Sequence, residues 1–243
     1  MVDYVPMDKL RTHLILDYLK AKKRCTLPEL MRKFKVSSAT IHRDAEELAR
    51  RDAVSKVRGG LVWNERMATV QTDSSGYQER IIANRKAKMS IAQMALDLVT
   101  EGDILFLDSS TTVYEFAQLL RAADFQHLTI VTNSVSIMQN FRKFPPQYVL
   151  IGLGGNYDAQ LNSILGAATL EQLSHFNVTK AFISAFGMDA KTVTTNHERQ
   201  AELIRKALDN ASKRYLLLDH SKVNRTGLYR LAARGTFDAI ITN

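Results

Sequence analysis

Polar residues and glycines follow several short apolar runs in the last two thirds of the chain. The first such turn is Asp108-Ser-Ser-Thr-Thr112, and the last is Asp219-His-Ser-Lys222. A polar turn that opens a helix offers free amides, hydroxyl donors and the positive end of the helix dipole, which suits a phosphate. A lysine neutralises such an anion, and an aspartate accepts hydrogen bonds from sugar hydroxyls. The pattern therefore indicates a site for a small, oxygen-rich anion.

Five consecutive predicted strand ends carry hydrogen-bond donors, glycines or a charge. One such end alone is more often an ordinary helix cap, but five on one rim favour a ligand pocket. The residues that we expect to contact the ligand are Asp108, Ser109, Ser110, Thr111, Thr112, Thr132, Asn133, Ser134, Gly154, Gly155, Asp189, Asn196, Asp219 and Lys222.

Apolar runs and amphipathic segments alternate through this part of the chain. Strands are expected over 103–107, 128–131, 148–151, 180–185, 214–218 and 237–241, and helices over 85–99, 112–121, 134–143, 167–174 and 197–211. Continuous apolar strands separated by helices predict a buried, mostly parallel sheet in a doubly wound α/β domain. Such folds bind ligands outside the carboxyl ends of their strands, where the polar turns lie.

Lys and Arg are concentrated in the first quarter of the chain. Residues 1–66 hold 15 Lys and Arg against 9 Asp and Glu, a net charge of +6, whereas the remaining residues carry +2 of the overall +8. This asymmetry is typical of a polyanion-binding module joined to a near-neutral body. A well-solvated basic face would give the same asymmetry. The predicted secondary structure of this segment is therefore needed to distinguish it from a polyanion-binding module.

The same segment has the pattern of a winged helix-turn-helix. We expect helices over 8–22, from a Thr26 cap to about Lys35, and from a Ser37 or Ser38 cap to about Arg51. Residues 54–62 alternate around two glycines, which predicts a basic hairpin beside the third helix. Two short helices with a tight turn, a packing helix before them and a hairpin after them are the parts of this motif.

The third helix would turn Ile41, Ala45 and Leu48 inward and leave its N-terminal end exposed. Such an end enters the major groove of DNA, where arginine contacts guanine with two hydrogen bonds. The expected DNA contacts are Ser37, Ser38, Thr40, His42, Arg43, Lys56 and Arg58, the last two on phosphates or in the minor groove. A three-helix scaffold that binds no DNA is the alternative.

Both halves of the chain resemble DeoR-type bacterial repressors. The run Val36-Ser-Ser-Ala-Thr-Ile-His-Arg-Asp-Ala-Glu-Glu-Leu48, followed by Gly59-Gly60, resembles their winged helix-turn-helix, with His42 and Ala45 where the family pattern has Arg and Leu. The motifs that resemble their effector-binding half are Leu107-Asp-Ser-x-Thr-Thr112, Thr132-Asn-Ser134, Gly154-Gly155, Gly166, Gly187-x-Asp189, Thr194-Thr-Asn196 and Asp219-x-Ser-Lys222.

This resemblance implies a fold like that of the sugar-phosphate isomerases and a regulator of carbohydrate use. Its partners would be double-stranded operator DNA and a phosphorylated sugar as effector, and the chain would form a homo-oligomer, a dimer or a tetramer. Two departures from the family pattern, Ser110 in place of Gly and Asn224 where a Gly often follows the lysine, concern the identity of the ligand more than the fold.

We expect a DNA-binding domain over 1–63, a polar linker over 64–80 and the effector domain over 81–243. The single cysteine, Cys25, excludes an internal disulfide and favours a reducing, cytoplasmic setting. No run of about 18 apolar residues predicts a membrane span. Nucleotide loops, serine-hydrolase elbows and metal-ligand spacings are absent, so we expect no cofactor, metal or catalytic residue. A sugar-phosphate isomerase-like enzyme with an added basic module, and a body that only dimerises, are the alternatives.

Overall fold

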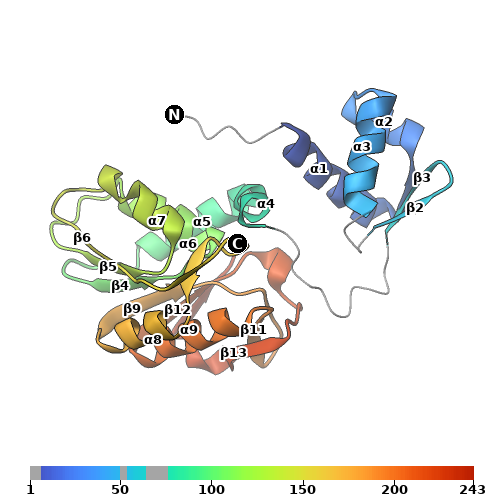
Figure 1. The fold of residues 1–243 in the computed structure, drawn as a ribbon. Coiled ribbons are helices and arrows are strands. Elements are labelled where there is room, and N and C mark those ends of the chain that lie inside the picture. Colours follow the sequence, from blue (N-terminus) through green and yellow to red (C-terminus); the bar gives the residue numbers. More distant parts are fainter. Residues whose placement is uncertain (1–6, 50–53, 64–75) are drawn as a thin grey trace. The chain divides into compact units, whose positions relative to one another are not determined.

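The computed structural model describes residues 7–49, 54–63 and 76–243. The chain folds as two compact units, residues 1–74 and residues 75–243 (Figure 1). The expected end of the third helix, near Arg51, lies outside the described residues.

The N-terminal unit contains the predicted helices and hairpin. Helices α1 (Met7–Lys22), α2 (Leu27–Phe34) and α3 (Ser38–Ala49) precede strands β2 (Val54–Val57) and β3 (Gly60–Trp63). A further strand, β1 (Arg24–Thr26), pairs antiparallel with β3 and gives the strand order β1-β3-β2. The sequence does not indicate β1, because three residues are too few to show an alternation.

The glycine pair of the hairpin has two different functions. Gly59 adopts φ +81° in the turn, a left-handed conformation that favours glycine. Gly60 lies against β1, where a Cβ atom would stand 2.4 Å from the carbonyl oxygen of Cys25. The first glycine therefore makes the turn, and the second lets β1 join the sheet.

The core of this unit confirms the predicted inward face of α3, because Ile41, Ala45 and Leu48 are fully buried. In α1, by contrast, the apolar side chain of Leu14 is 47% exposed. The buried positions of α1 include Thr12, Ile15 and Leu19, and this spacing leaves Leu14 on the solvent side.

A buried ion pair joins α1 to α3. Arg11 Nε donates to Asp44 Oδ2 at 2.6 Å, and Arg11 Nη2 donates to Asp44 Oδ1 at 3.0 Å. Asp44 is almost completely buried, so its carboxylate depends on this two-pronged contact. The contact holds α3 on the packing helix and leaves the opposite side of α3 to solvent.

The C-terminal unit is built on a parallel sheet. In the part of the chain that the structure describes, six strands have the spatial order β14-β12-β9-β4-β5-β6, and all neighbours run parallel. They are β4 (Ile104–Leu107), β5 (Thr129–Thr132), β6 (Val149–Gly152), β9 (Val178–Ile183), β12 (Ala211–Leu217) and β14 (Ala239–Ile241). The order reverses between β4 and β9, so the predicted doubly wound fold is confirmed.

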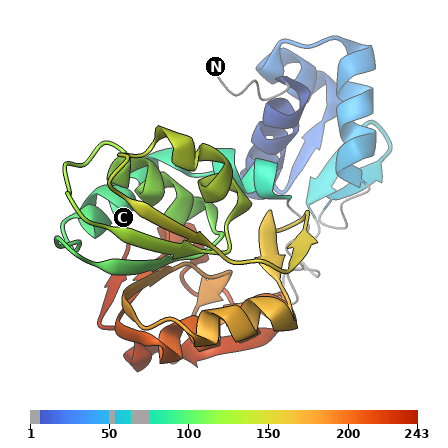
Figure 2. The same ribbon diagram turned by 60° about the vertical axis from the view of Figure 1, so that its left-hand side comes forward.

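Helices cover both faces of this sheet (Figures 1 and 2). Helices α5 (Arg85–Leu96), α6 (Thr111–Leu120) and α7 (Val135–Asn140) pack on one face, and α8 (Ala167–Ser174) and α9 (Glu198–Asp209) pack on the other. Successive residues of β4 alternate between the two cores: Leu105 and Leu107 face the first group of helices, and Phe106 faces the second.

Several short strands lie outside the predicted elements. They are the hairpin of β7 (Asn156–Asp158) and β8 (Ser163–Leu165), and the antiparallel sheet of β10 (Gly187–Met188), β11 (Thr192–Thr195) and β13 (Tyr229–Ala233). These strands have two to five residues and border glycines or polar turns, so no periodicity marks them in the sequence.

Helix α4 (Tyr77–Ile82) corrects the predicted linker. The expected linker covers 64–80, but residues 77–80 are helical. Tyr77 is buried, and its amide donates to the carbonyl oxygen of Gln160 at 3.1 Å. Most of this stretch is polar, which favours the prediction of a linker. Its one aromatic residue, Tyr77, anchors the start of α4 by its burial. The remainder of the expected linker, residues 64–75, lies outside the described residues.

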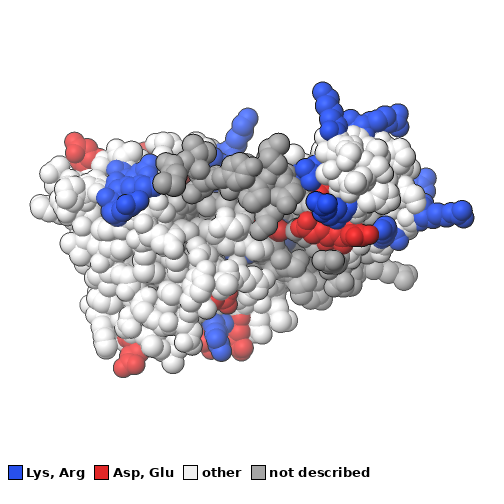
Figure 3. Space-filling model, turned by 45° about the horizontal axis from the view of Figure 1, so that its top comes forward, with Lys and Arg blue, Asp and Glu red and all other residues white. Residues whose placement is uncertain are grey.

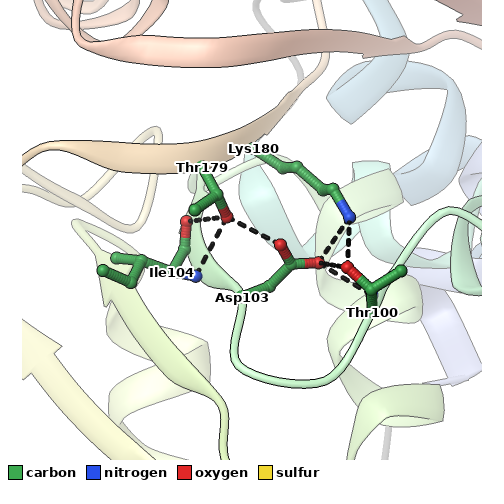
Figure 4. A network of polar contacts seen from close by, with 5 residues as sticks. All are labelled: Thr100, Asp103, Ile104, Thr179 and Lys180. Atoms are coloured by element: carbon green, nitrogen blue, oxygen red, sulfur yellow. Dashed lines mark hydrogen bonds and ion pairs between the residues drawn. The ribbon is translucent and has the colours of Figure 1, made fainter.

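A polar network joins the amino ends of β4 and β9, the two neighbouring strands between which the strand order reverses (Figure 4). Lys180 Nζ lies 2.6 Å from Asp103 Oδ2, and both side chains are largely buried. The Asp103 carboxylate also accepts hydrogen bonds from the Thr100 amide at 2.8 Å and from the Thr179 hydroxyl at 2.8 Å. Burial works to raise the pKa of Asp103, but the hydrogen bonds outweigh burial and lower this pKa below its usual value.

Candidate functional site

The N-terminal end of α3 is capped and exposed. Ser37 Oγ accepts a hydrogen bond from the Thr40 amide at 3.3 Å and lies 2.9 Å from the Thr40 hydroxyl. Ser38, His42 and Arg43 are exposed, and Thr40 is half-buried. The cap orders the first turn of α3, so the side chains predicted to meet DNA project from a rigid helix end.

The hairpin adds basic residues beside this helix. Arg58 is exposed in the turn between β2 and β3, and Lys56 Nζ lies 3.5 Å from Glu46 Oε1 of α3. Both members of that pair are exposed, so the contact is weak and leaves Lys56 available for another anion. Lys and Arg side chains also project from other parts of the described surface of this unit (Figure 3).

In the C-terminal unit, Asp108 lies at the carboxyl end of β4, where the strand order reverses. Its Oδ2 accepts a hydrogen bond from the Ser184 amide at 2.8 Å, and its Oδ1 accepts one from the Ser110 amide at 2.8 Å. Burial raises the pKa of Asp108 to about 6, although these hydrogen bonds oppose the rise. Asp108 therefore ties β4 to the end of β9 and shapes the turn before α6.

Two buried hydroxyl groups follow the carboxyl ends of β4 and β9. Thr112 Oγ1, in the first turn of α6, and Ser184 Oγ, directly after β9, have no hydrogen-bond partner within the described structure. Ser110 Oγ accepts from the Val113 amide at 3.2 Å and so caps α6. A buried hydroxyl without a partner is costly, and a ligand oxygen that reached these groups would remove that cost.

The end of β5 has a similar construction. The Thr132 hydroxyl donates to the carbonyl oxygen of Leu107 at 2.6 Å, and Ser134 Oγ caps α7 by accepting from the Ile137 amide. Asn133 Nδ2 donates to Ser163 Oγ at 2.6 Å, whereas the buried Asn133 Oδ1 has no partner among the described residues. The structure therefore places Asn133 with the two unpartnered hydroxyls on the same rim of the sheet.

Other predicted ligand contacts are engaged within the protein. The Gly154 amide donates to Gln172 Oε1 at 2.9 Å, and a Cβ atom on Gly155 would lie 2.2 Å from Thr169 Oγ1, so these glycines serve the packing of α8. Asp189 accepts hydrogen bonds from the amides of Lys191 and Thr192 and closes the turn between β10 and β11. These amides also lower the pKa of Asp189.

Asn196 Oδ1 accepts from the Leu228 amide at 3.0 Å, so this side chain also supports a loop. Asp219 and Lys222, by contrast, lie on the rim with Asp108. Lys222 Nζ donates to the carbonyl oxygen of Ala185, directly after β9, at 2.8 Å. Asp219 is buried and accepts from Ser221 Oγ and from Asn84 Nδ2.

Sequence reasoning missed Lys88 and Asn84, which border this rim. Lys88 Nζ donates to the carbonyl oxygen of Arg80 at the end of α4, and its side chain is only 3% exposed. Burial is the first cause that lowers the pKa of Lys88, to about 7, and the nearby Lys222 is the second. Lys88 precedes the buried Ile91, Ala92 and Ala95 at helical spacing, so it lies on the buried face of α5.

Two absences hold for the described parts of the chain. No helix there is long and apolar enough to cross a membrane. Nor do three or more His, Cys, Asp or Glu side chains of these residues gather as metal ligands.

Known families and a solved structure are similar to this chain. A family model for the DeoR C terminal sensor domain matches residues 83–243, and a model for the DeoR-like helix-turn-helix domain matches residues 11–67. The translation initiation factor eIF-2B of Pyrococcus horikoshii OT3 is a structural neighbour with a TM-score of 0.51 and 12% identity, covering 98% of this chain and 95% of its own. That likeness concerns the fold alone.

Curated relatives cover nearly the whole chain. The HTH-type transcriptional repressor GlcR of Bacillus subtilis is 31% identical over 94% of this chain and 86% of its own length. The L-fucose operon activator of Haemophilus influenzae is 30% identical over 96% of this chain and 91% of its own length. With the capped, exposed α3 and the parallel sheet, these matches show that the chain belongs to the DeoR family of transcriptional regulators.

Proposed function

We propose that this protein is a DNA-binding repressor of a carbohydrate-utilisation operon, and that a phosphorylated sugar releases it from its operator. The observation that carries the DNA-binding part is the capped, solvent-exposed N-terminal end of α3 beside a basic hairpin. Relatives named as a repressor and as an operon activator support transcriptional regulation over an isomerase-like activity.

The geometry suits DNA in two ways. Arg43, exposed on the first turns of α3, is placed to contact base edges in a major groove, where arginine discriminates guanine. Lys56 and Arg58 on the hairpin suit phosphates, and each neutralised phosphate releases counterions, so binding depends strongly on salt. Two copies of the chain would present two such helices to half-sites about one helical turn apart, which favours a homo-oligomer. We further propose that this oligomer works in the cytoplasm.

The rim of the parallel sheet supports the effector part. Unpartnered buried groups of Thr112, Ser184 and Asn133 lie at the ends of β4, β9 and β5. The N-terminus of α6, a ten-residue helix, and Lys222 supply positive charge near them. We assign Ser109, Ser110, Thr111 and Thr112 to the phosphate, and Asn133, Asp108 and Asp219 to sugar hydroxyls.

Arg43→Ala is expected to weaken binding to the protein's own operator by about 1–3 kcal/mol, roughly 5- to 150-fold, because a base contact is lost. Binding to random duplex should change much less. Fluorescence anisotropy with duplexes from the protein's own promoter region, at several salt concentrations, measures both. Lys56→Ala is the matched control, since loss of a phosphate contact weakens both duplexes equally. Equal losses for Arg43→Ala on the two duplexes contradict base recognition by Arg43.

Sugar phosphates are expected to stabilise the C-terminal unit against thermal unfolding. At 100 times the dissociation constant the gain is about 2.7 kcal/mol. A panel of glucose 6-phosphate, fructose 6-phosphate and ribose 5-phosphate, with the unphosphorylated sugars as controls, tests this by thermal shift. Stabilisation by a phosphorylated sugar without its conversion supports the regulator. Turnover supports the isomerase-like enzyme, and equal effects of sugars with and without phosphate contradict the assignment of the phosphate to α6.

A further inference from the structure

Helix α4 connects the predicted effector site to the rest of the chain. It is the first described element after residues 64–75, which link it to the N-terminal unit along the chain. Its N-terminal part is held by Gln160, whose carbonyl oxygen accepts from the Tyr77 amide at 3.1 Å and from Arg80 Nη2 at 3.2 Å. A change in the position of α4 therefore moves the point from which the chain leads to the DNA-binding unit.

The C-terminal end of α4 is held by the rim of the effector site. The Arg80 carbonyl oxygen accepts hydrogen bonds from Lys88 Nζ and, at 3.4 Å, from the Thr111 hydroxyl. Carbonyl groups in the last turn of a helix have no partner within the helix, and a cation there also suits the helix dipole. Thr111 belongs to the turn that we assign to the phosphate, so the same hydroxyl serves both the ligand and α4.

Asn84, which follows α4 by two positions and caps α5, makes a second connection to the rim. Asn84 adopts φ +54°, and its Nδ2 donates to Asp219 Oδ1 at 3.1 Å and to Ser221 Oγ at 2.9 Å. Asp219 is one of the acceptors that we assign to the sugar hydroxyls. The two ends of this short connection, Arg80 and Asn84, are thus bonded to different parts of the same site.

We propose that Lys88 and Asn84 are positioning residues that couple the effector site to α4. A ligand that engages Thr111 and Asp219 weakens the hydrogen bonds of Thr111 to Arg80 and of Asp219 to Asn84. The position of α4 then changes, and with it the point from which the chain leads to the DNA-binding unit. This inference rests on the proposed function. A ligand acts on an equilibrium only through its different affinities for the two states, and here the difference is the contacts of Thr111, Lys88 and Asn84.

The proposed coupling also predicts a change in the protonation of Lys88 when a ligand binds. The charged groups around its ammonium are Lys222 and Asp219, both of which follow β12, Glu115 on α6 and Arg80 on α4. Burial and Lys222 lower the pKa of Lys88 to about 7, so near pH 8 most of this side chain is neutral. A phosphate bound at the N-terminus of α6 raises that pKa again, and ligand binding then takes up a proton.

The test uses the full-length protein and two variants with a matched control. Asn84→Gly removes the amide and suits the left-handed backbone, and Lys88→Met removes the charge at similar length. Lys86→Met alters an exposed lysine on the same helix. Glucose 6-phosphate, fructose 6-phosphate, ribose 5-phosphate and inorganic phosphate are the probes. Calorimetry in two buffers of different ionisation enthalpy measures probe binding and proton uptake, and anisotropy measures release of promoter DNA.

We expect Asn84→Gly and Lys88→Met to bind the active probe within about 3-fold of the unaltered protein, while the effect of that probe on DNA binding falls about 10-fold, within the usual range of coupling energies. Proton uptake near pH 8 should disappear in Lys88→Met alone. Lys86→Met should match the unaltered protein in every measurement.

Three outcomes overturn the inference alone, and a fourth overturns it together with the proposed function. Full DNA release in both variants shows that the contacts of α4 do not couple the sites, and loss of probe binding in both shows that they are ligand contacts instead. If the unaltered protein binds DNA and a probe but the probe leaves DNA binding unchanged, there is no coupling to transmit. Failure of the unaltered protein to bind DNA or any probe overturns the proposed function itself, and the inference with it.

Discussion

Lys180→Met lowers the free energy of unfolding of the C-terminal unit by about 3 kcal/mol or more, because it leaves the buried carboxylate of Asp103 without its cation. The hydrogen bonds from Thr100 and Thr179 remain, but they do not supply a compensating charge. Urea unfolding followed by far-ultraviolet circular dichroism measures the loss. Trp63, the single tryptophan of the chain, lies in the N-terminal unit, so its fluorescence should report an unchanged transition.

Lys213→Met is the matched control for this prediction. Lys213 also comes from a strand of the sheet, β12, and pairs with Asp238 at 2.9 Å, but its side chain is 57% exposed. Exposed ion pairs contribute about 0–1 kcal/mol, so this variant should unfold close to the unaltered protein. Equal destabilisation by the two substitutions would show that burial does not distinguish the two ion pairs.

The second large effect is a change in how stability depends on pH. Burial and the nearby Lys222 lower the pKa of Lys88 to about 7 in the folded protein, whereas a solvated lysine has a pKa of about 10.5. Between these values the unfolded chain binds one proton more than the folded chain, so the free energy of unfolding rises with pH. Over the whole window the rise amounts to about 4–5 kcal/mol, at 1.36 kcal/mol per pKa unit. Below pH 7 the full penalty of burying the charge applies.

Lys88→Met is therefore expected to be more stable than the unaltered protein at pH 7, by on the order of 1–4 kcal/mol. The advantage should shrink as the pH approaches 10, because the lysine of the unaltered protein is then neutral when folded. Unfolding curves of both proteins and of Lys86→Met, recorded at each pH from 7 to about 10, give the comparison. Parallel stability profiles for the Lys88→Met variant and the unaltered protein would contradict a depressed pKa at Lys88.

The gain in stability would accompany a loss of regulation if Lys88 has the coupling function that we propose. Burying an ammonium group costs free energy that an apolar side chain would save. A group retained at such a cost is a better candidate for function than one that also stabilises the fold.

The sequence predicts the parallel sheet well because each strand is an apolar run bounded by turn residues. Expected strand 148–151 appears as Val149–Gly152, and expected helix 167–174 appears with the same bounds. The strand expected over 180–185 ends at Ile183, where its pairing with β12 ends. The prediction runs too long because Ser184 and Ala185 are still buried beyond that point. Burial and strand pairing therefore end at different residues. Only burial can be predicted from the sequence, because buried positions are rich in apolar residues.

The candidate site was predictable where its residues follow strands, as Asp108, Asn133 and Asp219 do. The rest depends on contacts between distant parts of the chain. Asn84 meets Asp219, which lies 135 residues later, and no local pattern encodes that meeting. Lys88 occupies a position of the buried stripe on α5 that an apolar residue normally takes, so its charge alone suggests the solvent side.

The strand order also constrains how the protein is made. β4 pairs with β9, yet β9 is synthesised roughly 70 residues after β4. At ~5–20 residues per second, a ribosome needs about 4–14 s to deliver that partner. During this interval one edge of β4 has no neighbour and is open to association with other nascent chains. Slow translation between residues 107 and 178 would lengthen this exposure, whereas the N-terminal unit, already complete, would be unaffected.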